Sequence, residues 1–301
     1  MTDETVRVSE RWLALREPAD AEARARDLVR VLVKRLPVTG HRVIYDLGCG
    51  SGAMVRWLAP RLPGPQHWVL HDRDPDLLAA AGAALPGPAA DGAAVTVETK
   101  RSDISRLHPD DLAGATLITA SALLDMLTED ELADLARLCV AAECPALLTL
   151  SVAGRVELTP GDPLDGRVAA AFNAHQRRGT DRGRLLGPDA PAAAAEVFAR
   201  LGAEVLERPS PWRIGAPNSE LVAQWFADWV GAACEQEPAL GAEMDAYTRR
   251  RLAEVTAGQL AVIVDHADLL VLPPQRRPGE SHPAESGTSS MCAPRAAFVP
   301  R

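Results

Sequence analysis

The stretch VIYDLGCGSGAM, residues 43–54, decides the fold of this 301-residue chain. It opens as a short apolar run, which is typical of a buried strand, and then places Asp46 ahead of glycines at positions 48, 50 and 52. Glycine permits tight turns and lets the backbone approach a ligand closely. Residues 51–62 then show helical periodicity. A strand, a glycine-rich turn and a helix in this order predict a ligand site at the end of the strand.

Strands and helices alternate through the first 150 residues. Apolar runs predict strands at 42–48, 66–72, 93–103, within 115–127, and at 145–152. Helical periodicity predicts helices at 20–36, 51–62, 74–85 and 129–142. Asp20 and Asp74 are expected N-caps, and Thr128 with Glu131 is an expected capping box. This alternation predicts a parallel sheet with helices on both faces and a ligand at the carboxyl ends of its strands.

The pattern is less regular after Val152, where the fifth strand is expected to end. Further helices are predicted at 164–177, 190–202, 218–236 and 242–258, and further strands at 203–209 and 260–273. The chain is therefore expected to contain an N-terminal lid segment (1–19), a ligand-binding core (20–152), a substrate and cap region with the last strands of the sheet (153–273), and a disordered tail rich in Pro, Ser and Gly (274–301).

The composition favours a small-molecule partner. The formal net charge of −9 leaves no excess of basic residues for binding nucleic acid. The chain has five cysteines without metal-ligand spacing, so we expect reduced cysteines and no metal site. The N-terminus opens with acids rather than a signal peptide, and no run approaches the roughly 18 apolar residues of a membrane helix. We therefore expect a cytoplasmic protein without membrane contact; the sequence does not indicate its oligomeric state.

The ligand of the glycine-rich turn can be argued from charge. Gly48, Gly50 and Ala53 satisfy the G-x-G-x-x-G/A fingerprint of dinucleotide-binding folds, so NAD or FAD is an alternative ligand. Such a turn receives a pyrophosphate, which is a dianion. Asp46 would place a negative charge beside it, and at ~4 Å and an effective dielectric of about 20 like charges repel by roughly 4 kcal/mol. A ligand that carries an ammonium and a sulfonium would be attracted instead.

The segment YDLGCGSGAM (45–54) resembles the first motif of the class I S-adenosylmethionine-dependent methyltransferases, in which an acid and a small or apolar residue precede Gly-Cys-Gly-x-Gly. The resemblance covers residues 40–152 well and extends loosely to the end of the chain. It implies an α/β fold, a Rossmann-like doubly wound seven-stranded mixed sheet with helices on both faces and a helical cap insertion. It also implies S-adenosylmethionine as cofactor, in contact with Asp46, Gly48, Cys49, Gly50 and Gly52.

Later strand ends extend the resemblance. In this family an acid at the end of the second strand binds both ribose hydroxyls, which implies this role for Asp72. The third strand is expected to end near the adenine amino group, and the fourth beside the methionine part and the reactive methyl. The implied further contacts are Arg73, then Ser102, Asp103 and Ile104, then Thr119, Ala120 and Ser121. For Asp103, a simple turn residue is the alternative interpretation.

Two residues are candidate catalytic groups. Asp125 falls where relatives often carry histidine, so it is a candidate to orient the acceptor or act as a base; capping or solvation is an equal alternative. His175 is a second candidate base, next to Arg177 and Arg178. These three basic residues suit a carboxylate or phosphate, or else they stabilise the end of a helix. Trp12 and Leu15 are expected to pack inward if the N-terminal segment closes over the cofactor.

Aromatic residues concentrate in the expected cap region, at Trp212, Trp225, Phe226 and Trp229. Trp225 and Trp229 lie four apart on one helix face, which is typical of a core stripe, with a ligand cage as the alternative.

The sequence thus predicts methyl transfer from S-adenosylmethionine to oxygen, nitrogen or carbon of a small molecule. The composition, rich in Ala, Arg and Pro, is typical of GC-rich bacteria, in which such enzymes often serve specialised metabolism. The alternatives are an RNA or protein methyltransferase, a non-catalytic S-adenosylmethionine-binding module and an NAD-dependent oxidoreductase. RNA is disfavoured by the acidic charge, and oxidoreductase chemistry by Asp46.

Overall fold

A computed structural model of the protein describes residues 8–37, 39–84 and 86–274. Within these residues, eight strands form one mixed sheet: β1 (Arg42–Leu47), β2 (Gln66–Asp72), β3 (Val95–Arg101), β4 (Leu117–Ser121), β5 (Ala146–Thr159), β8 (Glu204–Pro209), β9 (Trp212–Ile214) and β10 (Ala261–Leu272). The strand order is β3-β2-β1-β4-β5-β10-β8, and β9 pairs with β10. Strands β1 to β5 are parallel, whereas β10 is antiparallel to its neighbours. The mixed sheet is confirmed, with β9 as an additional short strand.

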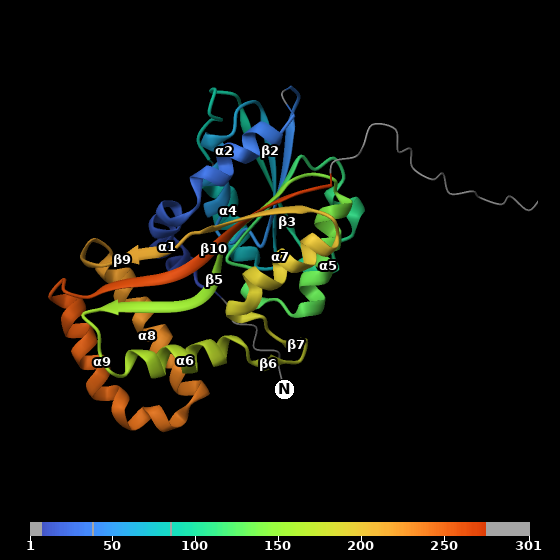
Figure 1. Ribbon diagram of the computed structural model, residues 1–301. Helices are drawn as coiled ribbons and strands as arrows, with labels where there is room; N and C mark the ends of the chain where they lie inside the picture. Colours follow the sequence, from blue (N-terminus) through green and yellow to red (C-terminus); the bar gives the residue numbers. More distant parts are fainter. Residues whose placement is uncertain (1–7, 38, 85, 275–301) are drawn as a thin grey trace, which may run out of the picture.

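Helices cover both faces of this sheet (Figure 1). On one face, α2 (Arg26–Arg35), α3 (Ala53–Leu58) and α4 (Pro75–Ala83) pack on the sheet through one apolar cluster. On the other face, α5 (Glu129–Ala141) and α7 (Ala190–Arg200) do so through a second cluster. The doubly wound arrangement is therefore confirmed. No helix among the described residues is long and apolar enough to cross a membrane.

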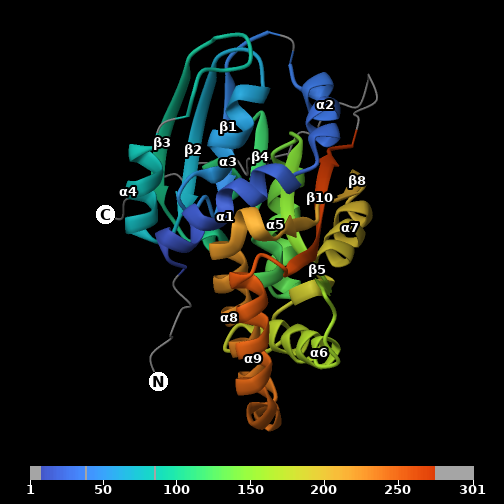
Figure 2. The same cartoon turned by 90° about the vertical axis from the view of Figure 1, so that its left-hand side faces the viewer.

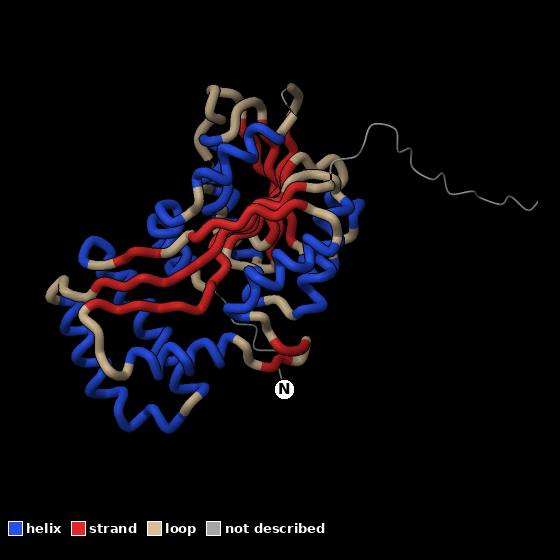
Figure 3. Tube along the Cα trace, viewed as in Figure 1, coloured by secondary structure: helices blue, strands red, loops and turns tan. Residues whose placement is uncertain are grey.

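Two long strands carry a helical cap. The outer parts of β5 and β10 pair from Val156 with Val264 to Thr159 with Ala261, beyond the parallel part of the sheet. They run out over α6 (Asp165–Gln176), α8 (Ser219–Gln236) and α9 (Gly241–Thr256), which gather at one end of the molecule (Figures 2 and 3). These cap elements share a separate apolar cluster that includes Phe226.

The expected end of the fifth strand at Val152 is wrong, because β5 continues to Thr159. In residues 152–159 half-buried or buried positions alternate with exposed ones, which is the two-residue period of a half-covered strand. Gly154 lies inside this strand with a φ of +81°. The glycine therefore permits a local irregularity of the strand rather than ending it.

The helix predicted at 20–36 is two helices. α1 spans Glu10–Ala23, and the chain turns at Arg24 before α2. Asp20 is thus inside α1 and is not an N-cap. Its buried carboxylate instead accepts hydrogen bonds from Arg16 and, at 2.9 Å, from the indole N–H of Trp212. The domain boundary expected between residues 19 and 20 consequently falls within a helix, while residues 1–7 and the predicted tail beyond Pro274 lie outside the described residues.

Two other helix starts follow their sequence signals. Asp74 accepts a hydrogen bond from the backbone N–H of Asp76 at 2.9 Å, as an N-cap of α4. Thr128 and Glu131 form the predicted capping box of α5, with reciprocal side-chain to backbone bonds. These signals are local, so they are unaffected by how distant segments pack.

Candidate functional site

A cavity of about 810 Å³ lies where β1 to β4 end. This volume is near the upper end of the ~300–1,000 Å³ typical of small-molecule sites. One side is formed by the glycine-rich turn and the residues that follow β2 and β3, and another by the residues that follow β4. Helix α1 and three aromatic residues of the cap region close it: Phe172, Trp212 and Trp225. The cavity therefore joins the sheet core to the cap.

The glycine-rich turn has left-handed backbone geometry, with φ of +67° at Gly48 and +54° at Gly50. A Cβ at Gly50 would lie 3.0 Å from a methyl group of Leu13 in α1. Both glycines and Cys49 line the cavity, which a larger side chain would narrow. Gly52 is outside the lining; its φ of +83° starts α3, and a Cβ there would meet Ala81 at 3.3 Å. Its role is local packing.

Asp46, the penultimate residue of β1, has a buried carboxylate of which one oxygen has no partner among the described residues. Its side chain is 1% exposed, and its Oδ1 accepts a hydrogen bond of 2.7 Å from Thr119. Its Oδ2 is buried without a hydrogen-bond partner among the described residues. Burial raises the pKa of Asp46 to about 7, against the opposing effects of Thr119 and Arg24. Such an oxygen requires a hydrogen-bond donor, preferably a cationic one.

Arg24 is a cavity residue that the sequence did not indicate. It lies between α1 and α2, is 2% exposed, and donates to the hydroxyl of Ser121 at 3.1 Å. Its Nε and Nη1 are buried without acceptors among the described residues. Burial lowers its pKa, and the charge of Asp46 acts in the opposite direction. The guanidinium also lies 5.2 Å from the ring centroid of Trp57. Arg24 thus offers free N–H groups to an anion in the cavity.

Asp72 connects the two loops that face the cavity. Its Oδ2 accepts the backbone N–H of Gly50 and its Oδ1 that of Asp74, both at 2.9 Å. Each carboxylate oxygen still has a lone pair for a ligand hydroxyl. Arg73, the next residue, is exposed and also lines the cavity. The structure therefore brings the expected ribose residue and the glycine-rich turn together.

The residues after β3 also reach the cavity. Ser102 shares a hydrogen bond of 2.7 Å with His71, and Ile104 packs on the core while lining the cavity. Asp103 lines it as well, but its carboxylate caps a short turn by accepting from the hydroxyl of Ser105 at 2.7 Å and from its backbone N–H. These bonds, the hydroxyl first, lower the pKa of Asp103. Both interpretations of Asp103, ligand contact and turn residue, are therefore compatible with its position.

The fourth strand contributes one of its three expected residues to the cavity wall. Ser121 lines the cavity, whereas Thr119 and Ala120 do not. Thr119 acts through its bond to Asp46, and Ala120 is 1% exposed within an apolar cluster. The alternation of side chains along a strand explains part of this, because consecutive residues point to opposite faces.

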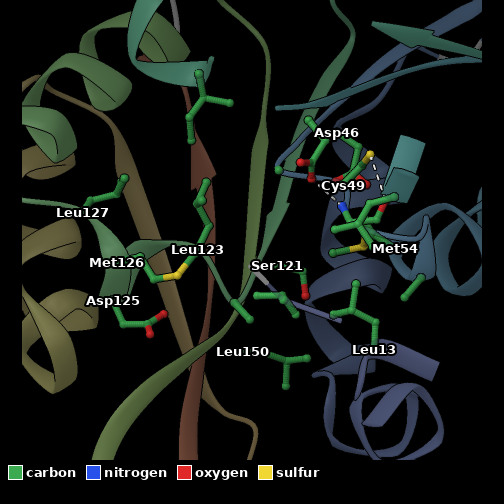
Figure 4. Close-up of a pocket in the computed structure, with 18 of the residues that line it drawn as sticks. Leu13, Asp46, Cys49, Met54, Ser121, Leu123, Asp125, Met126, Leu127 and Leu150 are labelled. Atoms are coloured by element: carbon green, nitrogen blue, oxygen red, sulfur yellow. Dashed lines mark hydrogen bonds between the residues drawn. The ribbon is translucent and has the colours of Figure 1, made fainter. Parts of the chain in front are cut away.

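Asp125 lies on the side of the cavity opposite Asp46 and Cys49 (Figure 4). It is half-buried in a short 3₁₀ turn, Leu124–Met126, and burial raises its pKa. Its surroundings are mainly apolar. We call this part the acceptor side and define it by Asp125 and the lining residues Leu123, Met126, Leu127, Leu150, Phe172 and Trp225.

The structure separates His175 from the cavity. Its ring pairs with Glu235 at 3.1 Å, and it is not among the lining residues. Arg177 is likewise engaged, donating two hydrogen bonds of 2.5 and 2.6 Å to Asp189. These basic residues stabilise the end of α6 and its neighbours, so the prediction of His175 as a base is not supported.

The four aromatic residues of the cap region all belong to its buried apolar cluster: Trp212, Trp225, Phe226 and Trp229. Trp212 and Trp225 line the cavity as well, whereas Phe226 and Trp229 do not. Trp12 and Leu15 of α1 both pack against that cluster, and Trp12 also lines the cavity. The helix face with Trp225 and Trp229 is thus both core and cavity wall.

Asp268 binds the backbone of Leu150, a residue that lines the cavity. Replacing Asp268 by alanine is expected to destabilise the fold. Leu150 has a φ of +57°, and Asp268 accepts from its backbone N–H at 2.8 Å, from Ser210 at 2.6 Å and from the N–H of Ala25 at 2.8 Å. Alanine leaves two buried donors and one half-buried donor unpaired, so the free energy of unfolding should fall by about 3 kcal/mol or more. Urea denaturation measures this. The more exposed Asp265→Ala is the control, and equal effects of the two changes would contradict the assignment.

Known proteins were compared with the whole chain. No family model matches it, and no curated protein matches it in sequence. A cyclopropane-fatty-acyl-phospholipid synthase-like protein from Lactobacillus casei is similar in structure, with a TM-score of 0.48, 15% identity and coverage of 86% of this chain and 92% of the other. A cyclopropane synthase from Mycobacterium tuberculosis has a TM-score of 0.47 and 13% identity, and the similarity covers 88% of this chain and 94% of the other. A Haemonchus contortus phosphoethanolamine N-methyltransferase in complex with S-adenosylmethionine has a TM-score of 0.38 and 12% identity, and the similarity covers 83% of this chain and 53% of the other. The chain's own strand order, with β10 antiparallel between β5 and β8, establishes the Rossmann-like doubly wound fold expected from the resemblance to class I methyltransferases.

Proposed function

We propose that the protein is an S-adenosylmethionine-dependent methyltransferase that acts on a small molecule. The observation that carries this proposal is the pair of Asp46 and Arg24. Each is at most 2% exposed, and each has buried polar atoms without partners among the described residues. The methionine part of the cofactor carries an ammonium, which would donate hydrogen bonds to Asp46, and a carboxylate, which would accept them from Arg24. A ligand with one charge alone would leave the other residue unsatisfied.

The remaining cavity residues fit the rest of the cofactor. Arg24 would hold the carboxylate, Asp46 the ammonium and Asp72 the ribose hydroxyls. Gly48 and Gly50 leave the backbone accessible, and Ile104 offers an apolar contact for the adenine. When bound, the cofactor supplies a methyl group activated by the adjacent sulfonium. The chain's contribution is mainly alignment and exclusion of water, to which Leu13 over the glycine-rich turn contributes.

The continuity of the cavity favours catalysis over simple cofactor storage. One cavity includes both the Asp46 region and the acceptor side, with Ser121 and Leu150 between them (Figure 4). An NAD-type ligand is disfavoured because its pyrophosphate is an anion and offers no cationic donor to Oδ2 of Asp46, which is buried without a hydrogen-bond partner among the described residues. The net charge of −9 disfavours an RNA substrate. Within this proposal, the composition favours a role in bacterial specialised metabolism.

The affinity for S-adenosylhomocysteine is expected to rise with pH. Because the pKa of Asp46 is raised to about 7, the free protein is largely protonated at this site below that pH. The ligand's ammonium favours the carboxylate, so binding should strengthen by up to about tenfold per unit between about pH 5 and pH 7 and then level off. Calorimetric titration across this range measures the slope. Asp46→Asn should flatten it, and a wild-type affinity that falls with pH would contradict the assigned role of Asp46.

Calorimetric titration with S-adenosylhomocysteine, with NAD in a parallel run, tests the proposed function. Binding of S-adenosylhomocysteine alone supports the proposal and permits a search for methyl acceptors. Binding of NAD alone overturns it, because the interpretation of Asp46 would then be wrong. Cofactor binding without methylation of any acceptor in a broad small-molecule panel would favour a non-catalytic binding module.

A further inference from the structure

Asp125 differs from the other carboxylates near the acceptor side. Glu131 pairs with Arg182 at 2.5 Å, and Asp134 pairs with Arg137. Asp125 has no ion-pair partner within 4.0 Å among the residues that the structure describes. Burial without a cationic partner is unfavourable for a carboxylate, so Asp125 gains from a ligand that supplies one.

The surroundings of Asp125 limit the rest of such a ligand. Leu123 and Leu127 are buried beside it, and Met126, although apolar, is 42% exposed. Phe172 and Trp225 add aromatic surface from the cap. A ligand on this side therefore buries apolar surface, with hydrogen-bond donors required where it meets Asp125 and the cavity-lining Gln176, whose Oε1 is buried without a partner among the described residues.

The nearby cationic and titratable side chains are already committed. Arg16 is held by Asp20 at 3.0 Å and lies 4.9 Å from the ring centroid of Trp212. Its charge acts on Asp125 only at longer range, lowering the pKa that burial raises. Burial lowers the pKa of His266 to about 3, so this residue is neutral. Arg182 is paired with Glu131. A carboxylate on the acceptor would therefore be repelled by Asp125, with no free cationic side chain among those named here to balance the two charges.

We propose that the methyl acceptor is an apolar amine with an aromatic or long alkyl group, and that Asp125 binds its nitrogen and takes its proton. This inference rests on the proposed methyltransferase function and specifies its substrate class. A protonated amine forms a charge-assisted hydrogen bond with Asp125, while its apolar part occupies the surface between Leu123, Phe172 and Trp225.

The atoms balance with Asp125 as the proton acceptor. The bound ammonium loses one proton to Asp125, which frees the nitrogen lone pair. This pair forms the new N–C bond to the methyl carbon as the S–C bond breaks, and the electrons of that bond remain on sulfur. The methylated amine is then positively charged, and Asp125 releases its proton to water. One proton is therefore released for each methyl group transferred.

Binding of matched probes to the protein saturated with S-adenosylhomocysteine tests the inference. Phenethylamine is compared with 2-phenylethanol and 3-phenylpropionate, and tryptamine and dodecylamine are compared with their alcohol and acid counterparts. At least one amine is expected to bind about tenfold or more tightly than its neutral and anionic counterparts. Asp125→Asn should remove this preference, and Asp130→Asn, an exposed acid on α5, should retain it.

The outcomes separate the inference from the function on which it rests. S-adenosylhomocysteine is titrated first into all three proteins. If it fails to bind the wild type, the proposed function fails. If it binds all three, the inference is overturned by equal or tighter binding of the alcohols or acids, by an amine preference that survives Asp125→Asn, or by the failure of every amine to bind at millimolar concentration.

Discussion

Replacing Arg24 by methionine is expected to weaken S-adenosylhomocysteine binding by about a hundredfold while leaving the ligand-free protein about as stable as the wild type, or more so. The variant loses the group proposed to hold the ligand carboxylate, and charge-assisted pairs in buried sites contribute about 2–5 kcal/mol. Two guanidinium nitrogens, Nε and Nη1, have no acceptor among the described residues, so burying the group is costly. Methionine has a similar length without that cost. Of the nearby acids, Asp20 keeps its bonds from Arg16 and Trp212, Asp268 keeps its three hydrogen bonds, and Asp46 can respond by protonation.

Calorimetry and urea denaturation measure the two effects of this change. Arg26→Met, two residues further and exposed, is the matched control and should alter neither. Methylthioadenosine, which lacks the amino-acid part, should bind the Arg24 variant as tightly as the wild type. Equal weakening of both ligands would show that Arg24 acts through the fold rather than through the carboxylate.

Replacing Asp72 by alanine is expected to weaken both S-adenosylhomocysteine and methylthioadenosine by about a hundredfold or more. Both ligands carry the ribose, and two hydrogen bonds from hydroxyls to one carboxylate contribute about 3 kcal/mol or more together. Arg24→Met, in contrast, should weaken only S-adenosylhomocysteine, because Arg24 is proposed to contact the amino-acid part of the cofactor and Asp72 the ribose. Calorimetric titration of both variants with methylthioadenosine measures this difference.

The alanine change also removes the acceptor for the N–H groups of Gly50 and Asp74. Asp72→Asn keeps one oxygen and is therefore the second variant. It is expected to retain the fold, followed by circular dichroism and urea denaturation, and still to weaken methylthioadenosine by more than about tenfold. Wild-type affinity for methylthioadenosine in a folded Asp72→Asn variant would place the ribose elsewhere.

Local patterns predicted the core and one side of the site. The apolar runs of β1 and β2 and the glycine spacing between 48 and 52 depend on residues adjacent in sequence. Parallel strands then bring Asp46, Asp72 and Ser102 to one edge of the sheet, so their proximity follows from strand order. The capping residues of α4 and α5 were predictable for the same local reason.

The other side of the site depends on tertiary contacts that no short pattern contains. Arg24 lies in a run of Ala and Arg that resembles a solvent-exposed helix, and contacts with residues distant in sequence, among them Trp57 and Ser121, accompany its burial. The sequence predicts Asp20 as an N-cap, but its carboxylate accepts a hydrogen bond from the indole of Trp212, which is distant in sequence. His175 resembled a base, yet Glu235 of α8 pairs with it outside the cavity. Each case requires the partner to be known before the residue can be assigned.

A crystal structure of the protein with S-adenosylhomocysteine would test the central claim most directly. The account predicts the ligand carboxylate on Arg24, its ammonium on Asp46, its ribose on Asp72, and its sulfur directed toward the acceptor side with Asp125. A ligand whose amino-acid part lies away from Arg24 and Asp46, or whose sulfur faces away from the acceptor side, would contradict the account.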